Sequence, residues 1–229
     1  MPFVTLACRH HSLSIMNSQT QYFLIDGAAG ALDCALDLPD SERFPAPRGI
    51  ALVAHPHPLF GGTMDNKVAQ TLVRTFVSLG YATARMNFRG VGRSAGTHDE
   101  GHGETDDMAL LLQHMRQRFP DLPVVLGGFS FGTFVLARLQ QQLIEQGTAA
   151  ERLVLVGCAA GKWPVPAVPA NTILIHGELD DTIPLANVFE WARPQELPVI
   201  VIPGADHFFH RKLPYIKKLV TDLWQPYNA

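Results

Sequence analysis

Cysteine is scarce in this sequence, and no long apolar run is present. Only three of the 229 residues are cysteines, and Cys8, Cys34 and Cys158 lie far apart. That spacing matches neither a disulfide framework nor a zinc site, and it favours a reducing, cytoplasmic location. No apolar run approaches the roughly 18 residues that a membrane-spanning helix needs. We therefore expect no disulfide, no metal and no membrane partner.

Charge of either sign is sparse as well. Charged residues make up 17% of the chain, and 18 basic against 21 acidic residues leave a net charge of −3. This balance provides no basic surface for nucleic acid. The 47% hydrophobic content excludes a disordered chain, and the length suffices for one sizeable core. We expect a single domain over residues 20–229. Residues 1–19 before it form an N-terminal tail that matches no helix or strand pattern and is a candidate for disorder. Met1 and Met16 both remain candidates for the start of translation.

Short apolar segments alternate along the chain with segments of helical periodicity. Two apolar runs, 21–26 and 31–38, flank a Gly-Ala-Ala-Gly turn and predict an antiparallel hairpin. The alternation predicts an α/β fold, a mostly parallel, doubly wound sheet of about eight strands with the hairpin at its antiparallel edge. We expect further strands at 50–54, 81–88, 124–127, 153–156, 172–175 and 199–202, and helices at 67–79, 105–119 (with Thr105 as N-cap), 131–146, 185–191 and 213–224.

The first segment with catalytic chemistry is Gly-Phe-Ser-Phe-Gly at residues 128–132, between an apolar strand and a helix. A sharp strand-to-helix turn strains its central residue and lifts the side chain clear of the sheet. Both glycines are needed because a Cβ there would clash with neighbouring backbone. The turn also sits at a helix N-terminus, which favours developing negative charge. We therefore predict that Ser130 is a nucleophile, against the alternative of a glycine-rich turn with an incidental serine.

A serine hydroxyl becomes a good nucleophile only when a base takes its proton. In this strand–turn–helix context an acid and then a histidine follow the serine along the chain. The loop after strand 172–175 carries Asp180 and Asp181, and the loop after strand 199–202 carries His207 and His210. Both loops leave the carboxyl ends of strands, where an open sheet binds its ligands. The sequence alone does not show which aspartate faces the histidine.

With these motifs the sequence resembles the α/β-hydrolase superfamily, and in particular the small, cap-less bacterial hydrolases similar to dienelactone hydrolase. The resemblance covers about residues 20–225. It rests on His-Pro-His-Pro…Gly-Gly-Thr-Met at 55–64, Gly-x-Ser-x-Gly at 128–132, His-Gly-x-x-Asp-x-x-Ile-Pro at 176–184 and Gly-Ala-Asp-His-Phe-Phe at 204–209. It implies a triad of Ser130, Asp180 and His207. About fifteen residues, 157–171, stand where many relatives insert a cap, so we expect an open site without one.

An oxyanion hole needs two backbone N–H donors aimed at the developing negative charge. The resemblance places one at Phe131, directly after the nucleophile. The other should come from the loop after strand 50–54, where Pro56 and Pro58 have no N–H to donate. His57 is the preferred donor, and Leu59 is the second choice. The candidates for apolar walls of the substrate pocket are Phe60, Phe129 and Phe208.

The segment Arg-Gly-Val-Gly-Arg-Ser at residues 89–94 looks like a phosphate-binding loop. It lacks the Lys-Ser/Thr ending of such loops and does not match Gly-x-Gly-x-x-Gly. We therefore interpret its glycines as turn formers after a strand. We expect Arg89 to form a structural ion pair with one of Asp99, Glu104 and Asp106.

Taken together, the motifs predict a serine hydrolase, a carboxylesterase or thioesterase that cleaves a small acyl substrate without a cofactor, as a monomer or homodimer. Two alternatives come from other classes. An α/β-hydrolase fold can be catalytically inert and serve as a binding module. A metal-dependent hydrolase could use the His-x-His pair of His55 and His57, but that leaves Gly-x-Ser-x-Gly unexplained and the chain is short for an eightfold barrel. The substrate and its acyl length stay open.

Overall fold

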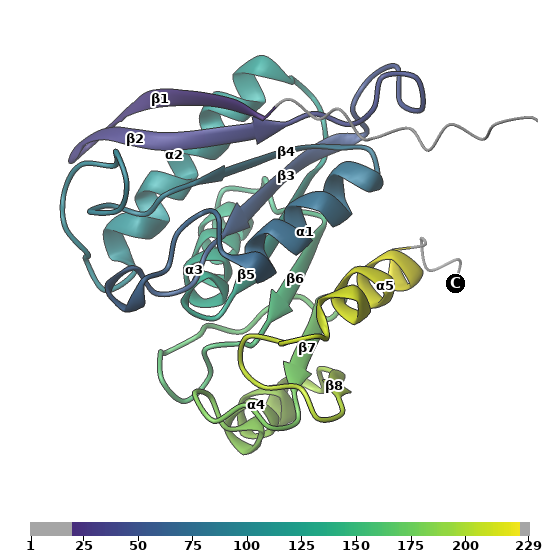
Figure 1. Ribbon diagram of the computed structural model, residues 1–229. Coiled ribbons are helices and arrows are strands. Elements are labelled where there is room, and N and C mark those ends of the chain that lie inside the picture. Colours follow the sequence, from purple (N-terminus) through teal and green to yellow (C-terminus); the bar gives the residue numbers. More distant parts are fainter. Residues whose placement is uncertain (1–19, 225–229) are drawn as a thin grey trace, which may run out of the picture.

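Eight strands pair into one sheet in the computed structural model, which describes residues 20–224 (Figure 1). The predicted tail, residues 1–19, lies outside the described residues. The strands are β1 (Gln21–Gly27), β2 (Gly30–Asp37), β3 (Gly49–Ala54), β4 (Tyr81–Met86), β5 (Val124–Phe129), β6 (Arg152–Val156), β7 (Ile173–Gly177) and β8 (Val199–Ile202). Their order across the sheet is β1-β2-β4-β3-β5-β6-β7-β8. β1 and β4 both pair with β2 in the antiparallel sense, and all other neighbours are parallel. The predicted sheet and its edge hairpin are therefore confirmed.

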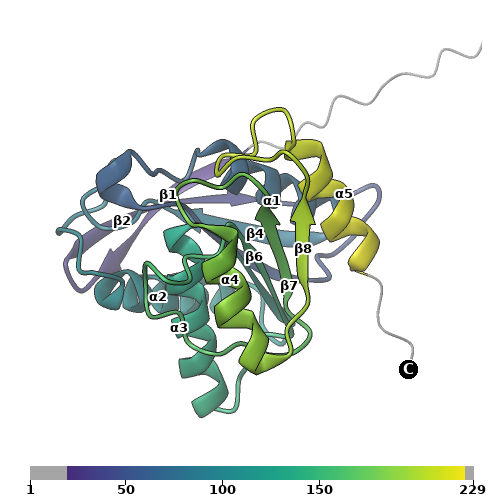
Figure 2. The ribbon, with the colours of Figure 1, turned by 90° about the horizontal axis from the view of Figure 1, so that it is seen from below.

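Helices cover both faces of the sheet, as Figure 2 shows. One face packs against α1 (Lys67–Ser78) and α5 (Leu213–Leu223), and the other packs against α2 (His102–Arg118), α3 (Phe131–Glu145) and α4 (Leu185–Ala192). The central strands are buried on both faces, so alternate residues enter opposite cores: Leu52 of β3 faces α2 and α3, whereas Val53 faces α1. Two short 3-10 helices, η1 (Pro58–Phe60) and η2 (Arg193–Gln195), complete the elements. Within residues 20–224 no helix combines the length and the apolar character that crossing a bilayer requires.

Residues 157–171 contain turns and one isolated bridge, between Ala160 and Trp163, but no helix. The indole of Trp191 in α4 donates to the carbonyl of Val165 at 2.9 Å, and this bond ties the segment to the body of the protein. The predicted absence of a cap is confirmed.

The start of α2 differs from the prediction of a Thr105 N-cap. The helix begins three residues earlier, at His102, and Gly101 caps it with a φ of 90°. The Glu104 carboxylate accepts the Gly101 N–H at 2.9 Å, and the Thr105 hydroxyl donates to the Gly101 carbonyl at 2.6 Å from inside the helix. Glycine adopts this left-handed backbone conformation without a steric penalty. The N-cap is therefore Gly101, and Thr105 lies inside the helix.

β4 also ends two residues before the predicted end at Phe88. The Asn87 N–H donates to the Asp33 carbonyl at 2.9 Å, and the Phe88 N–H donates to His55 Nε2 at 2.9 Å. These backbone groups are satisfied outside the strand ladder, and the chain turns there into the loop over residues 87–101. That loop passes beside the carboxyl end of β3.

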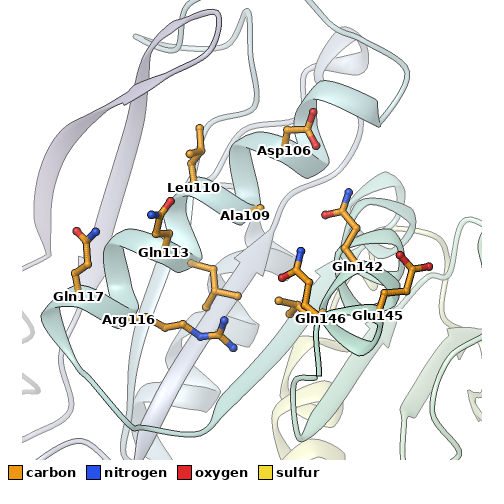
Figure 3. A pocket seen from close by; sticks show the side chains of 11 residues that line it. Asp106, Ala109, Leu110, Gln113, Arg116, Gln117, Gln142, Glu145 and Gln146 are labelled. Atoms are coloured by element: carbon orange, nitrogen blue, oxygen red, sulfur yellow. The ribbon is translucent and has the colours of Figure 1, made fainter. Parts of the chain in front are cut away.

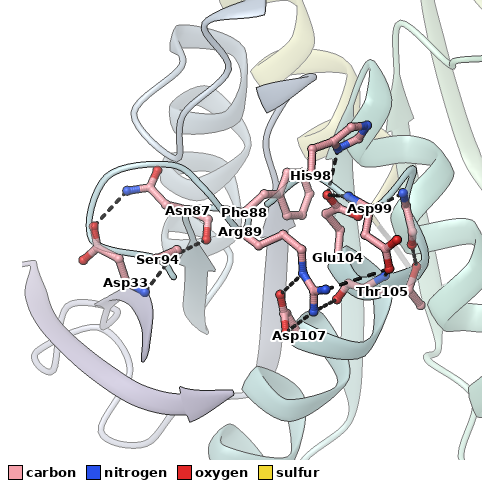
Figure 4. Close-up of polar contacts among 12 residues, drawn as sticks. Asp33, Asn87, Phe88, Arg89, Ser94, His98, Asp99, Glu104, Thr105 and Asp107 are labelled. Atoms are coloured by element: carbon pink, nitrogen blue, oxygen red, sulfur yellow. Dashed lines mark hydrogen bonds and ion pairs between the residues drawn. The ribbon is translucent and has the colours of Figure 1, made fainter. Parts of the chain in front are cut away.

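Arg89 in this loop forms a bidentate ion pair with Asp107, a partner that the sequence analysis did not name (Figure 4). Its Nε and one terminal nitrogen lie 2.8 and 2.9 Å from the two Asp107 oxygens, and Asp107 is completely buried. Of the three expected partners only Asp99 comes near, at 3.9 Å from another Arg89 nitrogen. The pair fastens the loop to the second turn of α2.

Candidate active site

Ser130 occupies a strained turn between β5 and α3. Its φ of 54° and ψ of −124° are conformations that a non-glycine residue rarely adopts. A Cβ at Gly128 would lie 2.7 Å from the Gly132 carbonyl oxygen, and a Cβ at Gly132 would lie 2.5 Å from the Ala54 oxygen. Both flanking positions therefore accept only glycine, for the steric reason given for the motif. The strained turn holds the serine side chain clear of the sheet.

The structure brings Ser130, His207 and Asp180 together from the carboxyl ends of β5, β8 and β7. His207 Nε2 lies 3.0 Å from Ser130 Oγ, and His207 Nδ1 lies 2.7 Å from Asp180 Oδ2. The side chains of His207 and Asp180 are almost fully buried, which keeps water from competing for these hydrogen bonds. With its Nδ1–H held by the carboxylate, the imidazole offers Nε2 as an acceptor to the serine hydroxyl.

The loop after β7 also separates the two candidate aspartates. Asp180 Oδ1 accepts backbone N–H groups of Thr182 and Ile183 at 3.0 and 2.7 Å, so the other oxygen is left to face His207. Asp181 is exposed, and its carboxylate accepts a long hydrogen bond from the adjacent Thr182 hydroxyl, at 3.4 Å. The geometry thus favours Asp180 over Asp181 as the partner of the imidazole.

A buried histidine, His176, stands behind Asp180 and did not figure in the predicted site. Its Nε2 donates to the Ile183 carbonyl at 2.9 Å and lies 3.3 Å from Asp180 Oδ2. Burial lowers the pKa of His176, so the ring is neutral and carries its proton on Nε2. It supports the loop that carries Asp180. The motif His-Gly-x-x-Asp was the only signal in the sequence that could have pointed to it.

His210, the other histidine of the last loop, pairs with Asp206, whereas His207 is the partner of Ser130. Its Nδ1 pairs with the Asp206 carboxylate at 2.6 Å, and its backbone N–H bonds the same side chain. This pairing lowers the pKa of the Asp206 carboxyl. Both side chains are exposed, so they stabilise a surface turn at the entrance to α5.

The two predicted oxyanion donors, the N–H groups of Phe131 and His57, lie on touching segments. The backbone of Gly132 packs on the end of β3, and the rings of His57 and Phe131 lie 4.8 Å apart. Neither N–H has an acceptor within residues 20–224. The N–H of Leu59, the second choice, donates to the ring Nδ1 of His57 at 3.2 Å and is therefore engaged. The structure favours His57 over Leu59.

The aromatic side chains around the serine differ from the expected set. Phe129 is fully buried beneath the His207 ring, at 5.0 Å between centroids, and so has no surface to offer an open crevice. Phe60 and Phe208 are 86% and 48% exposed, and their rings lie 4.8 Å from that of His57 and 5.1 Å from that of His207. Trp163, from the segment where a cap would be, packs on Phe131 at 4.9 Å. From the sequence Trp163 is a candidate wall residue, but a tryptophan is a core residue by default and nothing local to it indicates the contact with Phe131.

His55 is placed where it cannot serve as a metal ligand. Its Nδ1 donates to the Pro56 carbonyl at 2.6 Å, and its Nε2 accepts the Phe88 N–H. Both ring nitrogens are therefore engaged with backbone. Burial lowers the pKa of His55 to about 3, so the ring stays neutral in the folded protein.

A hollow of about 950 Å³ lies between α2 and α3, away from these residues (Figure 3). Seven of its eleven lining residues are polar or charged, among them Gln113, Arg116 and Gln142, and the others are alanine and leucine. No residue of the predicted triad or oxyanion hole lines it.

The fold and this site define the class of α/β serine hydrolases, and comparison with known proteins agrees. Residues 46–207 match the model of the family described as serine aminopeptidase, S33. The chain belongs to this family, and it is a hydrolase. A protein of Rickettsia prowazekii that is itself uncharacterized is 30% identical over 187 residues, which cover 76% of this chain and 77% of that protein. The lysophosphatidylserine lipase ABHD12 of Danio rerio is 34% identical over 94 residues, 41% of this chain and 24% of the lipase.

Solved structures give the same result over nearly the whole chain. The α/β serine hydrolase without lid from Xanthomonas campestris is 32% identical, with a TM-score of 0.83 over 92% of this chain and 97% of that one. The α/β serine hydrolase homologue from Coxiella burnetii is 31% identical, with a TM-score of 0.76 over 88% of this chain and 96% of that one.

The buried His55 predicts a specific dependence of stability on pH. The folded ring resists protonation down to a pKa of about 3, whereas in the unfolded chain its pKa is near 6.5. Between these values the unfolded state binds the extra proton, so stability falls as the pH falls. His55→Asn should lower the free energy of unfolding at pH 7, and its difference from wild type should shrink by about 2 kcal/mol between pH 7 and pH 5. Urea unfolding at both pH values measures this, and a difference that does not change with pH would contradict a neutral His55.

Proposed function

We propose that this hydrolase cleaves small esters or thioesters through an acyl-enzyme on Ser130. The observation that carries the proposal is the position of His207, whose two ring nitrogens lie 3.0 Å from Ser130 Oγ and 2.7 Å from Asp180 Oδ2. This is the arrangement of nucleophile, base and orienting acid that acyl transfer requires. The same arrangement weighs against an inert binding module, because binding alone does not require a serine, a histidine and an aspartate aligned by hydrogen bonds.

In the proposed reaction Ser130 Oγ attacks the substrate carbonyl while His207 Nε2 takes the hydroxyl proton. The Phe131 and His57 N–H groups stabilise the oxyanion that forms. Collapse of the intermediate breaks the bond to the leaving alcohol or thiol, which receives the proton from His207. A water molecule then attacks the acyl-enzyme with His207 again as the base, and the second intermediate collapses to release the acid while His207 returns the proton to Ser130 Oγ. Asp180 keeps the Nδ1 proton and stabilises the imidazolium in both halves of the reaction.

The absence of a cap over residues 157–171 supports an open site and a small acyl group. The partial similarity to a lysophosphatidylserine lipase supports an ester as the scissile bond, although it covers only 41% of this chain. The described cysteines, Cys34 and Cys158, are buried free thiols, and burial raises the pKa of each to about 12. Buried free thiols are compatible with a cytoplasmic enzyme.

A panel of p-nitrophenyl esters of rising acyl length, with acyl-CoA thioesters and amino-acid p-nitroanilides beside it, tests the proposal. Wild type should hydrolyse short esters or thioesters, and Ser130→Ala should reduce turnover to the background rate, because no other group can form the acyl-enzyme. Equal hydrolysis by Ser130→Ala would refute the proposal. A strong preference for the anilides would replace the esterase with a peptidase.

The roles of the two aspartates can be separated by matched substitutions. Asp180→Asn should lower kcat by about 10²-fold or more, because an amide at this position favours the wrong tautomer of His207. Asp181→Asn, one residue away and exposed, should leave kcat within about twofold. Steady-state kinetics on one ester measure both variants. Equal losses, or a larger loss for Asp181→Asn, would contradict the assignment.

The oxyanion hole predicts a contrast between two substitutions of His57. His57→Pro removes the backbone donor and should lower kcat by about 10²–10³-fold with little change in KM. His57→Ala keeps the N–H and should retain most of the turnover of a plain ester. Circular dichroism and thermal melting establish that both variants are folded before the kinetics are compared. Full activity in folded His57→Pro would move the donor elsewhere, and an inactive His57→Ala would assign chemistry to the imidazole.

A further inference from the structure

A second carboxylate–histidine pair lies on the loop after β4 and at the start of α2. His98 Nδ1 is 2.8 Å from Glu104 Oε1, and the Glu104 side chain is completely buried in the first turn of α2 (Figure 4). The same carboxylate accepts the N–H groups of Asp99 and Gly101 at 3.0 and 2.9 Å. All three partners are donors, as a carboxylate requires. His98 therefore carries a proton on Nδ1, and in the neutral ring its Nε2 is a hydrogen-bond acceptor.

The loop around His98 is held rigidly. The Asp99 carboxylate accepts the Gly103 N–H at 3.0 Å, and Arg89 binds both the Gly103 carbonyl and the buried Asp107 (Figure 4). A side chain on such a loop has a fixed position before any substrate arrives. Rigid placement is what a recognition group needs, because binding then costs little conformational entropy.

The His98 ring faces the candidate active site. It lies 4.6 Å from the ring of His57 and 5.4 Å from that of Phe131, which are the two residues whose N–H groups form the proposed oxyanion hole. The indole of Trp163 lies 6.2 Å from the His98 ring, measured between centroids. The side chain is 10% exposed. Among the described residues its Nε2 has no hydrogen-bond partner, yet it keeps contact with solvent.

His57 offers the opposite hydrogen-bonding character. Its Nδ1 accepts the Leu59 N–H, so the neutral ring carries its proton on Nε2. Burial lowers the pKa of His57, which favours the neutral ring. Its Nε2 also has no protein partner within residues 20–224 and is not sealed from solvent. A donor on His57 and an acceptor on His98 thus stand on neighbouring rings.

We propose that His98 and His57 together bind a hydroxyl group of the substrate, on either the acyl or the alcohol part, close to the scissile ester. A hydroxyl donates one hydrogen bond and accepts others, so it matches an acceptor and a donor placed side by side. The hydrogen bond to Glu104 uses only Nδ1 of His98. It does not explain why Nε2 has no hydrogen-bond partner in the described part of the chain and remains in contact with solvent. The inference rests on the proposed function, because it concerns the substrate of the same site. His98 is then a specificity-determining residue.

Two substitutions of His98 remove Nε2 in complementary ways. His98→Phe keeps a ring against His57 and Phe131 but leaves Glu104 one donor short. His98→Asn keeps an amide N–H for Glu104 but gives up the ring. The matched control is His102→Asn, because His102 is exposed in the first turn of α2 and its ring pairs with Arg138 of α3 at 3.0 Å.

The substrates come in pairs that differ by one hydroxyl. On the acyl side, p-nitrophenyl butyrate is compared with the p-nitrophenyl esters of 2-, 3- and 4-hydroxybutyrate. On the alcohol side, propyl butyrate is compared with the monobutyrate of 1,3-propanediol. Wild type and His102→Asn should prefer the hydroxyl-bearing member of at least one pair by about fivefold to tenfold in kcat/KM, the selectivity of one neutral hydrogen bond.

Both His98 variants should lose this preference, so that the ratio of kcat/KM between the two members of the pair falls to about one, whereas His102→Asn should keep it. The pair that shows the preference identifies the acyl or the alcohol side as the one that carries the hydroxyl. No preference in wild type, or a preference that survives in either folded His98 variant, would overturn the inference and leave the proposed function intact. An equal loss on both members of every pair would also overturn it, in favour of a structural role. If no ester of the panel is hydrolysed in a Ser130-dependent way, the proposed function fails, and the inference fails with it.

Discussion

The close approach between the first turn of α3 and the end of β3 positions the rest of the active site. A single Cβ on Gly132 would lie 2.5 Å from the Ala54 oxygen, and the two segments meet only because that Cβ is missing. The contact places the N–H after Ser130 next to the loop that carries His57. It also helps to hold Ser130 at a φ of 54°. This backbone conformation costs on the order of 1–3 kcal/mol relative to an ordinary one, so the surrounding packing must stabilise it. Nucleophile and proposed oxyanion hole thus depend on one packing contact.

Loops from the same edge of the sheet then complete the site. The loops after β7 and β8 deliver Asp180 and His207, and the loop after β4 delivers His98. Each histidine is fixed at Nδ1 by a buried carboxylate, 2.7 Å away for His207 and 2.8 Å away for His98. One imidazole faces the serine, and the other faces the ring of His57. The same pairing of a buried carboxylate with a histidine Nδ1 thus serves the base of the proposed triad and the histidine of the proposed hydroxyl site.

Much of this arrangement could be predicted because it follows from local patterns. Strand and helix periodicities placed the sheet and its helices. The order of the motifs placed a serine, an aspartate pair and a histidine at strand ends that meet, and the resemblance to the α/β-hydrolases chose Asp180 from the pair. What escaped prediction depends on contacts between distant segments or on backbone that only glycine adopts. Gly101, at a φ of 90°, starts α2 before Thr105. Arg89 pairs with Asp107, the residue next to the expected Asp106 and one helical turn after Glu104. The pairing of His98 with Glu104 needs the turn that Gly101 makes. Phe129 follows the strand pattern into the core, although its neighbour in sequence is the serine.

The central claim is that Ser130 is the residue that becomes acylated, with His207 as its base. A fluorophosphonate reacts covalently with an activated serine, and peptide mapping by mass spectrometry then locates the adduct. The account predicts one adduct per chain, on the peptide that contains Ser130, and formation at least about 10²-fold slower in His207→Ala, because the hydroxyl is a weak nucleophile without its base. An adduct on another residue, or labelling of Ser130 at an unchanged rate in His207→Ala, would contradict it.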